Sequence, residues 1–156
     1  MKIKLVVVSK TDADYLKEGI RSYADRLKHY VNFEYVEIPS VKNSGKLTQT
    51  ELKKTEGTAL LKQTESSSVL VVLDELGKEY NSPDFSKFLQ QQMNSGTKSL
   101  VFMIGGAFGF SEEVYKRANF KIALSQMTFS HQMVRLFFVE QLYRGFTIIK
   151  GEGYHH

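Results

Sequence analysis

The sequence alternates between short apolar runs and longer amphipathic stretches, and this alternation constrains the fold most. The runs are KIKLVVVS, FEYVEI, SVLVVLD, SLVFMI and FKIAL. KIKLVVVS, SVLVVLD and SLVFMI are apolar at almost every position, which is typical of strands covered on both faces. Strands that alternate with helices predict an α/β fold with a mostly parallel sheet flanked by helices. With 156 residues, we expect residues 1–156 to form a single domain.

Short polar motifs mark the starts of the intervening helices. Thr11 and Asp14 form a Thr-x-x-Asp helix start, and Thr48 with Glu51 has the spacing of a capping box. Ser111 precedes two glutamates, which suit the positive end of a helix dipole. The predicted helices cover about 11–30, 48–63, 82–93, 111–118 and 132–146, with Ser82 as the N-cap of the third. The segment SVKNSGK before the second is predicted to be a mobile loop.

Composition narrows the classes of function. The chain has no cysteine, which excludes a disulfide framework or a thiolate zinc site and fits a reducing, cytoplasmic compartment. Its four histidines have no metal-ligand spacing, so we expect no catalytic metal. The net charge of +4 and the pI of about 9.2 suit an anionic partner, although many basic domains never bind nucleic acid. No small-residue cleavage site follows the first apolar run, which we therefore interpret as a buried strand.

Three predicted strand ends in the second half of the chain carry the candidate chemistry. They read LDELGK at 73–78, IGGAFG at 104–109 and LSQMTFSH at 124–131. In a parallel sheet the carboxyl ends of the strands form the usual ligand site. The glycines of the second segment fit either a ligand loop or a plain tight turn. Neither a P-loop nor a G-x-G-x-x-G turn is present, which argues against a kinase, a GTPase or an ordinary dehydrogenase.

The last predicted helix is apolar all round, yet it carries charges. It is too short and too charged to span a bilayer, so we expect it to be covered by its own core and by a second subunit. Glu140 and Arg144 have the spacing of a helix ion pair, whereas Arg135 points to another side and needs an ion-pair or phosphate partner. His131 is either a helix-start residue or a site residue. The tail with Tyr154 and His155 either stacks on a base or is frayed, with histidines left from a tag.

Five ordered motifs together resemble one family. They are LD and GK at 73–78, IGG with Gly109, LSQMTFSHQMVR from Leu124, EQLYR at 140–144 and the terminal YH. The chain is similar over essentially its whole length to the RlmH family, the SPOUT-class methyltransferases of large-subunit ribosomal pseudouridine. The resemblance implies an α/β SPOUT-type fold whose C-terminal part, about residues 70–156, threads a deep trefoil knot.

The resemblance also implies a cofactor and a substrate. S-adenosyl-L-methionine would occupy the knot region of a homodimer, and the substrate would be N3 of a pseudouridine in a hairpin loop of 23S rRNA in the assembled ribosome. No DNA, membrane or metal is implied. The cofactor-binding residues carried over by motif are Leu73, Gly105, Gly106, Leu124, Ser125, Gln126, Met127, Thr128 and Phe129. Ser130 and Gly145 stand where the family often has proline and alanine, so we expect a looser cofactor loop and a looser helix end.

Methyl transfer to a ring nitrogen requires alignment of donor and acceptor and removal of the N3 proton. His131 and Arg144 are the candidate catalytic residues, with Tyr154 and His155 holding the base from the partner subunit's tail. Lys53, Lys54 and Lys62 are candidate contacts to an RNA backbone, although lysines on exposed helices are usually only solvated.

Two other functions remain open from the sequence. One is a ribosome-associated module that binds S-adenosylmethionine or another nucleotide without catalysis. The other is a nucleotide-dependent oxidoreductase, which the absence of a glycine fingerprint after the first strand disfavours. Cofactor binding without turnover would indicate the first, and binding of a nicotinamide nucleotide would indicate the second.

Overall fold

The computed structural model describes residues 1–156 as five parallel strands and five α-helices. The sheet order is β2-β1-β4-β3-β5, and every pairing is parallel. The strands are β1 (Lys2–Val8), β2 (Asn32–Ile38), β3 (Val69–Glu79), β4 (Ser99–Ile104) and β5 (Phe120–Ala123). The helices are α1 (Asp14–Leu27), α2 (Gln49–Leu61), α3 (Ser82–Asn94), α4 (Glu112–Arg117) and α5 (Met133–Ile149), with 3-10 turns η1 (Ser44–Lys46) and η2 (Gly153–His155).

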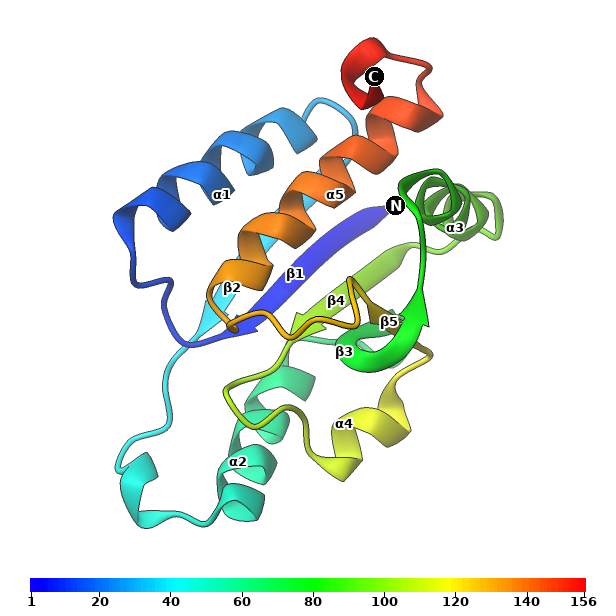
Figure 1. Ribbon diagram of the computed structural model, residues 1–156. Helices are drawn as coiled ribbons and strands as arrows, with labels where there is room; N and C mark the ends of the chain where they lie inside the picture. Colours follow the sequence, from blue (N-terminus) through cyan, green and yellow to red (C-terminus); the bar gives the residue numbers. More distant parts are fainter.

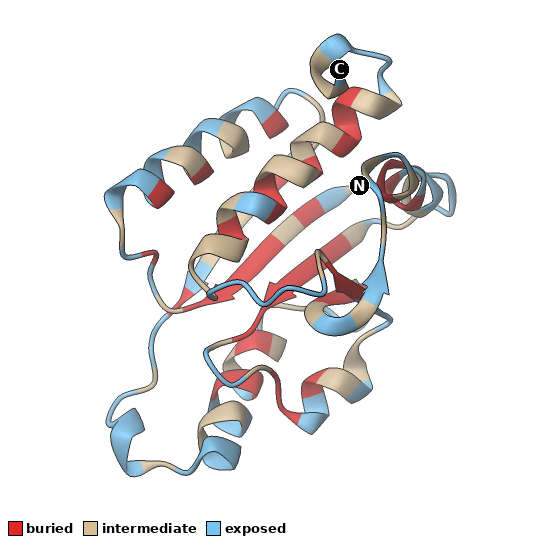
Figure 2. Cartoon of the chain, in the orientation of Figure 1, coloured by how far each residue is buried: buried red, intermediate tan, exposed pale blue.

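Helices cover both faces of the sheet. Figure 1 shows α1, α5 and α3 on one face and α2 and α4 on the other. Alternate residues of β1 enter different cores: Leu5 and Val7 pack under α1 and α5, whereas Val6 and Val8 pack against the α2 and α4 side. The two strands β1 and β4 are accordingly buried along most of their length (Figure 2). The predicted α/β architecture with a mostly parallel sheet is confirmed; the knot and the domain limits stay predictions.

The helix-start predictions succeed where the cap partner is local. Thr48 and Glu51 form the predicted capping box at α2, and the Ser111 hydroxyl accepts from the Val114 amide at α4. The prediction for Thr11 is wrong, because α1 begins at Asp14 after an N-cap residue with no side-chain bond. At α3 the N-cap is not Ser82 but the preceding Asn81, whose side chain accepts from the Asp84 amide.

β3 continues beyond the predicted strand through an irregularity between Leu73 and Lys78. After the irregularity, Lys78 pairs with Ile122 and Glu79 with Ala123 of β5. A Cβ atom on Gly77 would lie 2.6 Å from the backbone nitrogen and carbonyl carbon of Ile122, so only glycine fits there without moving β5. The intervening residues 74–76 project from the carboxyl edge of the sheet.

α5 is apolar on most sides because its own chain covers most of it. It lies between α1 and α3 over the sheet, and Phe138, Val139 and Leu142 are fully buried (Figures 1 and 2). Only Phe137 among its large apolar side chains is markedly exposed, at 42%. The chain itself thus covers all but one narrow side of α5, and the second subunit expected there stays a prediction. No helix in the structure meets the length and apolarity needed to cross a bilayer.

Ser130 and Gly145 each make a defined contact, and the expected loosening at both positions stays a prediction. Ser130 accepts a hydrogen bond from the Met133 amide at 3.0 Å, which ties the end of the loop 124–131 to the first turn of α5. Gly145 is buried well inside α5, and a Cβ there would lie 2.8 Å from Leu89 Cδ1. Glycine at position 145 thus allows α5 and α3 to approach closely, and the helix continues to Ile149.

Candidate functional site

A cavity of about 530 Å³ opens at the carboxyl ends of β3, β4 and β5. The three segments singled out in the sequence form most of its wall, because parallel strands bring their carboxyl ends to one edge. Of the predicted cofactor-binding residues, the cavity is lined by Leu73, Gly105, Gly106, Leu124, Ser125, Met127, Thr128 and Phe129. Gln126 belongs to the same loop but does not line the cavity; His131 does.

The glycine segment after β4 forms a tight turn that leaves room for a ligand. The amide of Gly109 donates to the Gly106 carbonyl at 3.1 Å, and Gly109 has a φ of 83°, a conformation that favours glycine. A Cβ on Gly105 would lie 3.0 Å from the Gly109 backbone. The segment is thus a tight turn, and it also forms part of the cavity wall. Its role as a ligand loop stays a prediction.

Two acidic side chains from the β3 projection face the same cavity. Asp74 accepts hydrogen bonds from the Tyr115 hydroxyl and from the Leu76 amide. Burial, together with the hydrogen bond to the Asp74 carboxylate, raises the pKa of Tyr115, which therefore stays protonated at neutral pH. Glu75 accepts from the Thr128 hydroxyl at 3.0 Å and so links the β3 projection to the loop 124–131. These carboxylates suit a ligand that carries hydroxyl groups or positive charge.

Apolar side chains at the rim of the cavity are left open to solvent. Leu76 is 83% exposed and Met127 77% exposed, and Phe108 and Phe129 are also exposed. Large exposed apolar groups around a cavity commonly contact a ligand or a partner. The rim therefore offers apolar contacts for a planar ring, next to the acidic groups described above.

Glu56 is a residue beside the site that the sequence analysis missed. It lies on α2 with 8% of its surface exposed, and its carboxylate approaches the glycine segment from behind. A Cβ on Gly106 would lie 2.7 Å from Glu56 Oε2, so a larger residue at position 106 would require the Glu56 carboxylate to shift. Burial raises the pKa of the Glu56 carboxyl above its ordinary value. No local sequence signal separates this glutamate from the exposed charges of the same helix.

Replacing Glu56 by glutamine is expected to stabilise the protein at neutral pH by about 1 kcal/mol, because the amide removes a buried charge. The folded state holds the proton more tightly than the unfolded state, so the cost of the wild-type charge appears as pH rises past the ordinary glutamate pKa. Urea unfolding of wild type and Glu56→Gln at about pH 4 and about pH 7.5 measures this. The difference in unfolding free energy between Glu56→Gln and wild type should be small at about pH 4 and larger at about pH 7.5.

The exposed Glu18 of α1 offers a matched control, since Glu18→Gln removes a solvated charge. Equal unfolding free energies for wild type and Glu56→Gln at both pH values would contradict the role assigned to burial of Glu56.

The other predicted catalytic residues form a second cluster at the far end of α5. Arg144 donates to Glu140 Oε1 through Nη2 at 2.6 Å and Nε at 3.1 Å, as the ion-pair alternative predicts. Tyr154 donates to the same oxygen at 3.0 Å and lies under the Arg144 guanidinium. His155 Nδ1 is 3.5 Å from Arg144 Nη1. The tail is therefore packed on α5 and is not frayed at these residues.

The electrostatics of this cluster fix the charge of two groups. The hydrogen bonds from Arg144 to Glu140 raise the pKa of the guanidinium further, so Arg144 stays a cation. Burial and the contacts with Tyr23 and Glu140 raise the pKa of Tyr154, which stays a neutral hydroxyl. The cluster offers one fixed cation and one hydrogen-bonding phenol, but no phenolate base.

Within one chain the four candidate catalytic residues do not meet. His131 lies at the cavity, and Arg144 lies thirteen positions along the chain, or about 20 Å away at the rise of an α-helix. Tyr154 and His155 belong to η2, the turn that follows the carboxyl end of α5 beside the C label in Figure 1, whereas His131 precedes the amino end of that helix. Arg135 is in neither place: it is fully buried, and its guanidinium bonds backbone carbonyls. Its Nη1 also lies 3.8 Å from Glu37 Oε2, which confirms the ion-pair alternative for this residue.

Comparisons with known proteins agree with this geometry. Residues 1–155 match the family described as "Predicted SPOUT methyltransferase". Two similar relatives, from Christiangramia forsetii and Cytophaga hutchinsonii, are 54% and 55% identical over all 156 residues and cover 99% and 100% of their own lengths. Both carry the name "Ribosomal RNA large subunit methyltransferase H".

A solved structure shares the fold at low identity. It is a probable methylase family protein from Haemophilus influenzae Rd KW20, with a TM-score of 0.53 and 9% identity. The match covers 97% of this chain and 69% of that one.

Proposed function

Because the chain belongs to the SPOUT methyltransferase family, among the ribosomal RNA large subunit methyltransferases H, we propose that it methylates N3 of pseudouridine 1915 of 23S rRNA in the assembled ribosome. The chain is an S-adenosyl-L-methionine-dependent rRNA methyltransferase. The cavity at the carboxyl ends of β3, β4 and β5 is the main observation that supports placing the cofactor site there.

The cavity fits the cofactor by its chemistry. Its wall combines a glycine turn, an apolar rim and the carboxylates of Asp74 and Glu75, which suit a molecule with an aromatic base, ribose hydroxyls and positive charge. Leu73, Gly105, Gly106 and the loop 124–129 would hold it. When bound, S-adenosyl-L-methionine supplies a methyl group activated by a sulfonium centre. Gln126 does not line the cavity, so its part in holding the cofactor rests on its place within the loop 124–131.

The reaction also needs groups that manage the proton at N3. This imide nitrogen becomes a good nucleophile only when its proton leaves, and a nearby cation stabilises the resulting anion. Arg144 is a permanent cation, so it can stabilise that anion but cannot accept the proton. Tyr154 stays protonated and can only position the base or donate a hydrogen bond. His131 and His155 are then the side chains that remain as proton carriers among the four candidates.

These groups act together if α5 of a second copy brings its tail to the cavity of the first. The surface beside the cavity supports a homodimer: a groove of about 430 Å³ is lined mostly by apolar residues, including Tyr80, Phe85, Phe129 and Phe137. The rings of Phe129 and Phe137 lie 5.1 Å apart at its edge. In the proposed composite site, His131 belongs to one subunit, and Arg144 of the partner subunit comes with its tail.

The proposal includes the assembled ribosome as substrate and hence the cytoplasm as the place of action. The net charge of +4 gives only modest attraction to RNA at physiological salt. Of the three candidate lysines, Lys54 and Lys62 are exposed and Lys53 is partly buried. Two of them are therefore free to contact the phosphate backbone of RNA. Selectivity for one nucleotide must then come from the shape of a larger particle.

The test is transfer of a labelled methyl group from S-adenosyl-L-methionine to ribosomes that lack the modification. Separated subunits and naked rRNA serve as parallel substrates. We expect label at one pseudouridine, and only in assembled ribosomes. Label at another nucleotide would contradict the substrate assignment. Cofactor binding without label on any substrate would instead indicate a non-catalytic, ribosome-associated module.

A further inference from the structure

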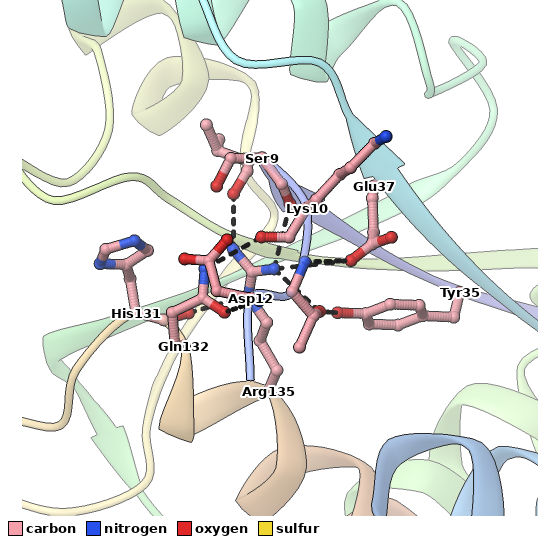
Figure 3. Close-up of polar contacts among 10 residues, drawn as sticks. Ser9, Lys10, Asp12, Tyr35, Glu37, His131, Gln132 and Arg135 are labelled. Atoms are coloured by element: carbon pink, nitrogen blue, oxygen red, sulfur yellow. Dashed lines mark hydrogen bonds and ion pairs between the residues drawn. The ribbon is translucent and has the colours of Figure 1, made fainter. Parts of the chain in front are cut away.

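The turn after β1 is tied to the end of the loop 124–131 by the hydrogen bonds of Arg135, which are buried or partly buried, and by those of Gln132, which are exposed. Figure 3 shows this cluster, in which Arg135 of α5 and Gln132, which precedes that helix, meet the backbone of residues 8–12. Neither side chain lines the cavity, although their neighbours His131 and Val134 do. The cluster therefore stands directly behind the cofactor site.

Arg135 is the centre of the cluster and is fully buried. Its guanidinium donates to the carbonyls of Val8 at 2.6 Å and Ser9 at 3.0 Å and to the Thr11 hydroxyl at 3.1 Å. Its Nε donates to the carbonyl of His131 at 2.9 Å. One side chain thus connects the end of β1 to the last residue of the cofactor loop.

Gln132 makes a second connection between the same two segments. Its Nε2 donates to the Lys10 carbonyl at 3.1 Å, and its Oε1 accepts from the Asp12 amide at 3.0 Å. Ser9 adopts a left-handed φ of 67°, which is uncommon outside glycine and requires support from its surroundings. The bonds from Arg135 and Gln132 to residues 8–12 supply that support.

The rest of the loop is weakly held. Residues 126–130 are exposed, and the side-chain bond that connects this stretch to another segment across the cavity is that of Thr128 to Glu75. Ser130 bonds only to the adjacent helix turn. The position of the loop is therefore set at its ends, by β5 on one side and by the Arg135 and Gln132 contacts on the other.

We propose that Arg135 and Gln132 are positioning residues that hold the loop 124–131 in its cofactor-binding form before the cofactor arrives. The inference rests on the proposed cofactor site. A loop that is already ordered binds with less loss of conformational entropy, so loss of these contacts weakens cofactor binding. Neither side chain reaches the cavity, so turnover at saturating cofactor should change little.

The test compares Gln132→Ala with Gln90→Ala, a glutamine on an exposed side of α3 that makes no side-chain hydrogen bond. Calorimetry measures the Kd for S-adenosyl-L-methionine, and methylation of ribosomes gives KM for the cofactor and kcat. We expect Gln132→Ala to raise Kd and KM about tenfold with kcat within about twofold, and Gln90→Ala to change nothing.

Arg135 is examined with two variants, because loss of a buried cation can prevent folding. Arg135→Lys keeps a cation that can bond some of the carbonyl oxygens now bonded by the guanidinium. It should therefore bind the cofactor more tightly than Arg135→Met does. Circular dichroism establishes which variants fold. If neither Arg135 variant folds, the cofactor Kd of Gln132→Ala tests the proposal. An unchanged cofactor Kd in folded Gln132→Ala, with the wild type binding normally, overturns this inference alone. Failure of the wild type to bind the cofactor overturns the proposed function and this inference with it.

Discussion

Arg144→Ala and His155→Ala are each expected to lower methyl transfer by about 10²–10³-fold while leaving the fold and the cofactor Kd nearly unchanged. In the proposed composite site, Arg144 supplies the fixed positive charge beside the nucleotide, and its charge is secured by Glu140. The ion pair itself is partly exposed and contributes only tenths of a kcal/mol to stability. Single-turnover methylation of ribosomes and calorimetric cofactor titration measure the two effects separately.

Lys150→Ala is the matched control, because it removes an exposed cation at the end of the same helix. Its turnover should stay within about twofold of wild type. Full activity in both Arg144→Ala and His155→Ala would exclude the tail from the reaction.

Mixed dimers test which subunit contributes each residue. When Arg144→Ala and His131→Ala chains are combined, a composite site in a mixed dimer regains both side chains, one from each chain. Random pairing in equal amounts should restore about a quarter of wild-type activity, because half of the dimers are mixed and each has one intact site. No recovery from mixtures of the two inactive chains would place His131 and Arg144 in sites within one chain.

Gly77→Ala is expected to destabilise the protein by about 2–4 kcal/mol. The added methyl would lie 2.6–2.7 Å from the backbone of Lys121 and Ile122, and a strand backbone cannot move aside as a side-chain tip can. The pairing of Lys78 and Glu79 with β5 would open, and with it one wall of the cavity. Urea unfolding measures the loss of stability, and calorimetry should find weaker cofactor binding in the folded fraction.

Gly45→Ala makes the same chemical change where no atom lies within 4 Å of the new methyl. It should leave stability unchanged or slightly raised, because alanine restricts the unfolded chain. Equal unfolding free energies for Gly77→Ala and Gly45→Ala would mean that β5 can move away at little cost.

The sequence predicts the elements well where the cause is local. The capping box at Thr48 and the strand pattern of β4 depend on neighbouring residues, and both are confirmed. The prediction for Thr11 is wrong because its hydroxyl bonds Tyr35 and Arg135, which lie 24 and 124 positions away. A helix-start motif of this kind carries no sign of such distant partners.

The candidate site also divides into residues that a local pattern predicts and residues that depend on distant packing. The three strand-end segments are predicted from the sequence because parallel strands bring those ends together, and eight of the nine residues predicted to bind the cofactor line one cavity. Tyr115, which lines the cavity, and Glu56, which lies against its glycine segment, were missed because they come from helices on the other face of the sheet. Their involvement depends on how α2 and α4 pack, which no pattern along those helices records.

The bonds of Arg135 to β1 also fix an order of events during synthesis. Its guanidinium contacts Val8 and Ser9, which precede it by 127 and 126 positions. At about 5–20 residues per second, a ribosome needs roughly 6–25 s to advance from the first of these residues to the arginine. The earliest strand made is thus among the last to acquire its full set of partners. The edge of β1 that pairs with β4 stays open until residue 104 has been made, and the turn after β1 acquires its Arg135 contacts only when translation is nearly complete.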